Sequence, residues 1–343
     1  MTAETPAPSG PAAPSARATA RPAEGWLDAK ERGGVFAIRL TVWLTTVLGR
    51  PFGRLVARFV TVYYTLTSPR ARRAIRDFRR RLEGREISGL DVYRHLLRFV
   101  HCTLDAFFFV SGKSASIHVT RTGHEHLLAL QRAKKGAILL GAHVGSFYAM
   151  RGSGQAERLP LYALMYTKNA RVLNDALATL DPEGAARLLE IDPEGGLDSM
   201  LRVKELLEGG ALIAILGDRI PPHASADRIV RAPFLGEEAP FPAGPFLLAS
   251  MLKCPVYLTV GLHRDPDTYD LYCEPFAERI DLPRRDRQAG LRKYVRAYAE
   301  RLEHFARKAP DNWFNFYDFW AATPAAQAPA SLAPEPTPPD PQR

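Results

Sequence analysis

The residues best suited to chemistry in this sequence lie around His143. His143 follows the apolar run at residues 137–140 and is followed shortly by Gly145. A short apolar run between glycines is typical of a buried strand. Open α/β sheets hold reactive groups at such strand-to-helix turns, and an imidazole titrates near neutral pH, as a general base must. The alternative is a turn histidine that only satisfies a local hydrogen bond.

A second candidate site follows the strand predicted at residues 161–166. It holds Lys168 and Arg171, with Asn174 about one helical turn further on. Basic side chains at the start of a helix form an anion site together with the free amides and the helix dipole. An ordinary solvated loop is the alternative for these residues.

A third candidate site follows the strand predicted at residues 211–216, where Asp218 and Arg219 stand side by side. A carboxylate and a guanidinium just after a buried strand serve one of three roles. They form a structural ion pair with each other, orient a catalytic base, or bind a phosphate. The sequence leaves these three roles open.

Short apolar runs alternate with helical stretches from about residue 117 onward. This alternation predicts the fold that positions the three loops with candidate site residues. Parallel strands covered by helices on both faces give such a pattern. We therefore predict the α/β class, with a mostly parallel central sheet flanked by helices and an N-terminal helical membrane-associating region. The predicted strands are 117–119, 137–140, 161–166, 188–191, 211–216, 256–262 and 269–276, and the predicted helices are 123–134, 170–180, 197–208, 244–252 and 287–308.

Composition divides the chain into four parts. Residues 1–24 and 322–343 are rich in Ala and Pro and are predicted to be disordered tails, whereas residues 113–321 form the α/β core. Residues 25–112 are predicted to be helical and membrane-associating, with apolar helices at 35–48 and 52–66, an arginine-rich helix at 69–83 and another helix at 89–112. A helical subdomain packed on its own core is the alternative.

The net charge of +9 and the cysteine usage narrow the function classes. A basic chain binds nucleic acid, anionic lipid or an acidic protein. The sequence contains no recognisable nucleic-acid recognition module, which disfavours the first of these partners. Cys102, Cys254 and Cys273 are far apart, and His124 and His126 have no further ligands nearby, so we expect no metal site. The motifs of serine hydrolases, P-loop NTPases and dinucleotide-binding enzymes are missing.

Four motifs then follow one another in order: Gly141-Ala-His143-Val-Gly145-Ser-Phe-Tyr148; Gly217-Asp218-Arg219; Ala232-Pro-Phe-Leu-Gly236 with Phe241-Pro242-x-Gly244-Pro245; and Trp313-Phe-Asn-Phe-Tyr-Asp-Phe-Trp320. Together they resemble the lysophospholipid acyltransferase superfamily and, within it, the branch of the bacterial lipid A late acyltransferases. The resemblance extends over about residues 25–320.

The resemblance implies an enzyme that moves a fatty acyl group from acyl carrier protein, or from coenzyme A, to a hydroxyl or amine of a membrane lipid. His143 would be the general base, and no cofactor is implied besides the acyl thioester. The implied substrate-binding residues are Gly145, Lys168, Arg171, Asn174 and Arg219, with Phe241, Pro242 and Gly244 helping to shape the acyl pocket.

Tyr148 departs from the family pattern, in which the fifth residue after the histidine is an acid. A carboxylate there orients the imidazole and stabilises its charged form, whereas a phenol is neutral at neutral pH. Three outcomes follow: another acid such as Asp218 replaces it, the enzyme is slow or works differently, or the chain binds acyl groups or their carrier without turnover.

The implied location is the cytoplasmic face of the bacterial inner membrane, with peripheral attachment or a single N-terminal anchor. The expected partners are acyl carrier protein, a lipid acceptor and an anionic membrane surface, and nucleic acid is not among them. The arginines at residues 70–81 suit acidic head groups and an acidic carrier protein alike.

Overall fold

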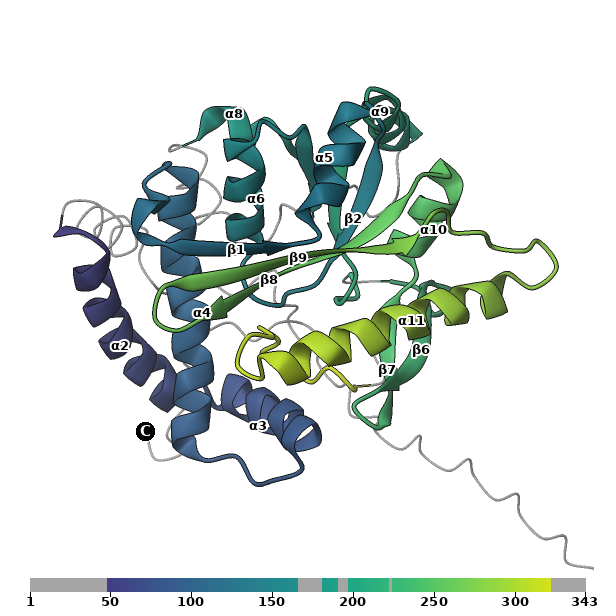
Figure 1. Ribbon diagram of the computed structural model, residues 1–343. Coiled ribbons are helices and arrows are strands. Elements are labelled where there is room, and N and C mark those ends of the chain that lie inside the picture. Colours follow the sequence, from purple (N-terminus) through teal and green to yellow (C-terminus); the bar gives the residue numbers. More distant parts are fainter. Residues whose placement is uncertain (1–47, 166–180, 191–196, 222–223, 322–343) are drawn as a thin grey trace, which may run out of the picture.

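The computed structural model describes residues 48–165, 181–190, 197–221 and 224–321 (Figure 1). The apolar segment at 35–47 and the helix predicted at 170–180 lie outside these residues, as do Lys168, Arg171 and Asn174. The predictions made for those segments therefore remain predictions.

A seven-stranded sheet forms the centre of the molecule. Most neighbouring strands are parallel, which confirms the predicted mostly parallel sheet, but β8 and β9 form an antiparallel hairpin. This hairpin reverses β9 and the edge strand β1 relative to the other strands. In spatial order the strands are β1 (His118–Thr122), β9 (Thr268–Ala277), β8 (Val256–Arg264), β2 (Ala137–Gly141), β5 (Leu212–Leu216), β3 (Leu161–Met165) and β4 (Leu188–Glu190).

Both faces of the sheet are covered (Figure 1). On the central strand β2, Ile138 and Leu140 join the main core, whereas Ala137 and Leu139 join a smaller cluster on the other face. This division follows the alternation of side chains along a strand. Helices α5 (His124–Arg132) and α6 (Phe147–Ala156) cover the face of the smaller cluster, and α11 (Arg287–Lys308) covers the main core.

The bounds of several helices agree with the sequence-based prediction. Helices α9 (Leu197–Glu208), α10 (Gly244–Leu252) and α11 begin and end at the predicted residues. A short helix, α8 (Pro182–Ala185), was not predicted.

A two-stranded ribbon was also not predicted. Strands β6 (Ile229–Phe234) and β7 (Glu237–Pro242) pair antiparallel outside the main sheet. The prolines at 233, 240 and 242 conceal these strands in the sequence, because proline is disfavoured in sheets except at edges and strand ends. The ribbon packs against α11, and Val230, Ala232 and Phe234 are buried in the main core.

The N-terminal region consists of three helices: α2 (Arg50–Thr67), α3 (Pro69–Glu83) and α4 (Gly89–Val110). Ser88 and Asp91 form a capping box that fixes the start of α4. Helix α2 packs on α4, and the small residues Gly53, Ala57 and Thr61 are buried on α2. No helix within the described residues is both long enough and apolar enough to cross a bilayer.

Candidate active site

His143 lies in the loop that joins β2 to α6, as predicted, and this loop is held tightly. Gly145 has a φ of 68°, and a Cβ atom there would lie 1.9 Å from the Gly261 carbonyl oxygen, so the position requires glycine. Its N–H donates to the Asn312 carbonyl (2.7 Å), while the Phe314 N–H donates to the His143 carbonyl (2.8 Å). The chain after α11 thus fixes the backbone on both sides of His143.

Asp218 meets His143 directly, although the two residues are 75 positions apart in the sequence. Oδ1 of Asp218 lies 2.8 Å from Nδ1 of His143, and Oδ2 accepts the His143 backbone N–H at 2.9 Å. The two residues follow β2 and β5, which are adjacent parallel strands, so their loops meet at the same edge of the sheet. Of the roles that the sequence left open for Asp218, its position matches that of a group that orients a base.

The electrostatics of the pair favour an ionised acid and a neutral imidazole. Burial alone would raise the pKa of Asp218, but His143, Arg219 and the Trp313 N–H outweigh it and lower this pKa to about 2. Burial lowers the pKa of His143, and the charge of Arg219 lowers it further, against the opposing effect of Asp218. A neutral imidazole beside an ionised carboxylate carries its proton on Nδ1, which leaves the Nε2 lone pair free.

Trp313 is a third member of this arrangement that the sequence did not assign to the site. Its indole Nε1–H donates to Oδ2 of Asp218 at 3.0 Å, and its side chain is fully buried. An aromatic segment such as residues 313–320 either packs in the core or lies at a membrane interface, and the burial of Trp313 supports core packing. Only the resemblance of residues 313–320 to a family motif pointed toward this residue.

Tyr148 does not take the place of the missing acid. Its ring packs against the buried cluster of Ala106, Phe107 and Val110 and lies edge-to-face with Phe147. Within the described part of the chain, no hydrogen bond joins Tyr148 to His143. Burial raises the pKa of the Tyr148 phenol, so the group is neutral at neutral pH.

Arg219 lies beside the pair and is only partly satisfied. One terminal nitrogen donates to the Phe314 carbonyl at 2.8 Å, and the guanidinium lies 6.0 Å from the centre of the Tyr317 ring. Its Nε is buried and has no hydrogen-bond partner among the described residues. A partly exposed guanidinium next to a neutral histidine suits an anionic group of a substrate.

The segment expected to shape the acyl pocket lies in the main core. Phe241 is fully buried and packs edge-to-face with Phe234, Tyr298 and Phe319. Pro242 ends β7, and Gly244 begins α10. None of these residues lines the apolar cavity that the structure contains on the other face of the sheet.

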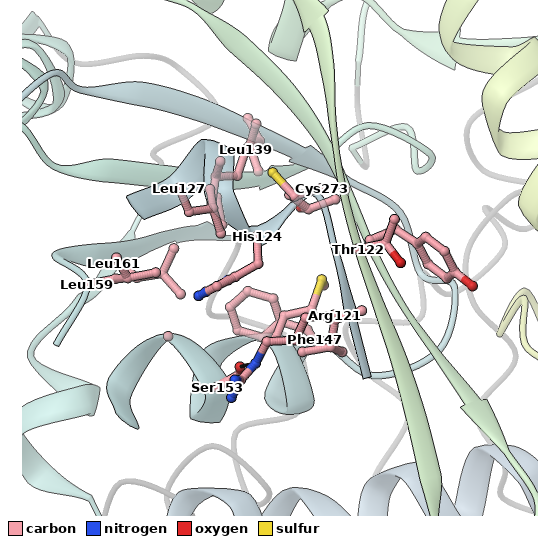
Figure 2. Close-up of a pocket in the computed structure, with 18 of the residues that line it drawn as sticks. Arg121, Thr122, His124, Leu127, Leu139, Phe147, Ser153, Leu159, Leu161 and Cys273 are labelled. Atoms are coloured by element: carbon pink, nitrogen blue, oxygen red, sulfur yellow. Dashed lines mark hydrogen bonds between the residues drawn. The ribbon is translucent and has the colours of Figure 1, made fainter. Parts of the chain in front are cut away.

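That cavity lies between α6 and the sheet (Figure 2). Apolar side chains form most of its wall, including Leu139, Met150, Leu161 and Leu216. Two other lining residues, Gly141 and Phe147, flank the His143 loop in the sequence. The cavity is therefore an apolar space beside the histidine loop.

Three of the polar residues that line the cavity, Arg121, His124 and Ser153, belong to a small cluster. Arg121 donates to the Ser153 hydroxyl at 2.7 Å and pairs with Glu157 at 3.3 Å. Glu157 also pairs with His124, one of the two closely spaced histidines discussed above as metal ligands.

A histidine–aspartate pair at the carboxyl ends of adjacent parallel strands is the arrangement of an α/β transferase or hydrolase site. The family model for bacterial lipid A biosynthesis acyltransferase matches residues 95–321, which is more than half of the chain. This protein therefore belongs to the bacterial lipid A biosynthesis acyltransferase family. The match begins at residue 95, so it does not cover the earlier part of the resemblance. A search of the curated proteins returns no match.

Proposed function

We propose that this protein transfers a fatty acyl group from an acyl carrier protein thioester, or from its coenzyme A equivalent, to a hydroxyl or amine of a membrane lipid. Family membership supports acyl transfer to a lipid. The single observation that carries the catalytic assignment is the 2.8 Å contact between Nδ1 of His143 and Oδ1 of Asp218. No cofactor besides the acyl thioester is part of this proposal.

In the proposed reaction, Nε2 of His143 removes the proton from the acceptor hydroxyl or amine as its oxygen or nitrogen attacks the thioester carbonyl carbon. Asp218 stabilises the imidazolium that forms. Collapse of the tetrahedral intermediate breaks the carbon–sulfur bond. The proton on Nε2 then passes to the departing thiolate, which restores the neutral imidazole and releases the free thiol.

The substrate groups are assigned by chemistry. The apolar cavity beneath α6 takes the acyl chain, because its wall is made mainly of hydrocarbon side chains. The partly exposed side chain of Arg219 binds a phosphate of the carrier arm or of the acceptor. Lys168, Arg171 and Asn174 stay proposed as part of the same anion site, outside the described residues.

A non-catalytic acyl or carrier binder is the second candidate, and the tyrosine at position 148 favours it. The contact of Asp218 with His143 weighs against a non-catalytic binder, because Asp218 supplies the carboxylate that Tyr148 lacks.

An acyl-transfer assay separates the two candidates. Purified protein is mixed with acyl carrier protein or coenzyme A carrying a labelled acyl chain and with a bacterial lipid extract. The proposal expects a labelled lipid and free carrier thiol, whereas carrier binding without any turnover would select the binder.

The rate of acyl transfer should depend on pH through His143. The neutral imidazole is the active form and its pKa lies below the usual histidine value, so kcat/KM should fall only when the pH drops below about 6.5. Replacing Arg219 with methionine removes a positive charge that lowers this pKa, so the acidic limb should move to higher pH. The measurement is kcat/KM against pH for both proteins, and a limb that stays in place in Arg219→Met contradicts the assignment to His143.

We further propose that the enzyme works at the cytoplasmic face of the bacterial inner membrane and binds it peripherally through α2. Five large apolar side chains of α2 are exposed, and at 100° per residue they fall within an arc of roughly 100°. They are Leu55, Phe59, Val62, Tyr63 and Leu66. Helix α2 contains no acidic residue. Arg58 on α2 and the arginines 70, 73 and 76 on α3 are exposed and suit anionic head groups.

Substituting both Phe59 and Leu66 with serine should weaken binding to vesicles of phosphatidylethanolamine and phosphatidylglycerol by roughly 10–100-fold. Each side chain is 70% exposed and would bury its apolar surface in the bilayer. Vesicle flotation measures the effect, with Met251→Ser as the control because Met251 is an exposed apolar residue of α10. Equal binding by the double variant and the control would remove α2 as the docking surface.

A further inference from the structure

Asp218 is buried to 2% exposure, and its carboxylate is held by three donors. Oδ1 faces Nδ1 of His143, while Oδ2 accepts both the His143 backbone N–H and the indole N–H of Trp313. A buried carboxylate requires such donors, because each unpaired lone pair in a dry site costs free energy. The two hydrogen bonds from His143 position the carboxylate, and the hydrogen bond from Trp313 supplies its third donor.

Trp313 is itself held from several sides. Its ring lies edge-to-face with Phe78, Phe234 and Phe319, with ring centres 4.7, 5.2 and 4.8 Å away. Its carbonyl oxygen lies 3.0 Å from Nε2 of His95. Burial lowers the pKa of His95 to about 4, so the ring is neutral and has one N–H, which it donates to this carbonyl.

The backbone of the same segment also contacts the catalytic loop. Trp313 forms an isolated β-bridge with Val144, the residue that follows His143. One residue thus contacts the loop of the base through its backbone and the carboxylate through its side chain. An indole anchored at both points fixes the rotation of the Asp218 carboxylate relative to the imidazole.

We infer that Trp313 is a positioning residue for the acyl-transfer reaction, which acts by holding the Asp218 carboxylate in the plane that aligns it with Nδ1 of His143. This inference rests on the proposed function, because it assumes that His143 is the base. The expected effect is on the chemical step: Trp313 reaches the acceptor and the thioester only through Asp218.

Trp313→Phe tests this inference, since phenylalanine keeps an aromatic ring in the cluster but has no N–H. We expect kcat to fall about 10–100-fold with little change in KM, because the hydrogen bond removed is to a charged group. The acidic limb of the pH profile should move to higher pH, since a carboxylate with one donor fewer attracts the imidazolium more strongly. The other charged or titratable groups near Asp218 are Arg219, Tyr298 and Tyr317, which the variant leaves in place.

Trp320→Phe is the matched control. Trp320 belongs to the same aromatic cluster and contacts Trp313 edge-to-face, but its buried Nε1 has no hydrogen-bond partner in the described part of the chain. The same atoms are removed without loss of a bond to the site. A role in packing alone would lower the thermal stability of both variants and leave both pH profiles unchanged.

A second replacement guards against poor folding of Trp313→Phe. Incorporation of 3-benzothienylalanine at position 313 keeps the shape of the indole and replaces its N–H with sulfur, so the lower kcat and the shifted limb should persist. Wild-type kcat and an unshifted limb in this protein would overturn the inference, even if His143→Ala abolishes turnover. If His143→Ala keeps full turnover, the proposed function itself fails, which is a separate result.

Discussion

The His143→Ala variant is expected to transfer acyl groups about 10²–10⁴-fold more slowly than the wild type, which is the usual contribution of a positioned general base. The free Nε2 of His143 is the proposed acceptor of the substrate proton, and alanine has no group to replace it. The measurement is the initial rate of labelled lipid formation from the acyl carrier thioester. The carrier should still bind, because the apolar cavity and Arg219 are unchanged.

His118→Ala serves as the control for this experiment, since His118 is an exposed histidine on the edge strand β1. Its activity should match that of the wild type. Unfolding temperatures of the two variants show whether the fold is intact. Turnover that survives His143→Ala at the wild-type rate would refute the role proposed for this residue.

The Asp218→Asn variant should lose up to about 10⁴-fold in kcat, the loss seen when the orienting acid of a serine protease is changed to an amide. Oδ2 of Asp218 accepts two N–H donors, so an asparagine would place its oxygen there and its amide nitrogen toward Nδ1 of His143. The amide then donates to Nδ1 and moves the imidazole proton to Nε2. In that tautomer Nε2 can no longer accept the proton of the lipid acceptor.

The comparison with Tyr148→Phe identifies which residue replaces the acid of the family motif. Tyr148 makes no hydrogen bond to His143 within the described residues, so removal of its hydroxyl should cost far less activity than Asp218→Asn. The rates of both variants are measured in one assay. A large loss in Tyr148→Phe together with a small loss in Asp218→Asn would assign the orienting role to Tyr148 instead.

The position of Asp218 explains how a chain that lacks the family acid retains a carboxylate at the histidine. The acid five residues after the histidine would come from the first turn of α6, whereas Asp218 comes from the loop after the adjacent strand β5. Its bond to the backbone N–H of His143 ties the carboxylate to the loop itself as well as to the ring. The structure thus supplies a carboxylate to His143 without an acid at residue 148.

Most of the local elements of this protein could be predicted from the sequence alone. Periodicity and turn residues report whether a segment is buried on one face or on both, and that information is local. Helices α9, α10 and α11 were located to the residue, and β2 to within one residue. The loop of His143 and the family resemblance followed from short motifs, because glycine, histidine and proline in such spacings serve specific backbone and chemical needs.

Only the tertiary structure decided how these elements meet. The order of the strands places the loops after β2 and β5 side by side, and so joins His143 to Asp218. The reversal of β9 and the pairing of the proline-containing strands β6 and β7 depend on contacts between distant segments, which local periodicity does not encode. The same holds for Trp313: the direction of its N–H toward Asp218 is set by packing against α3, α4 and β6.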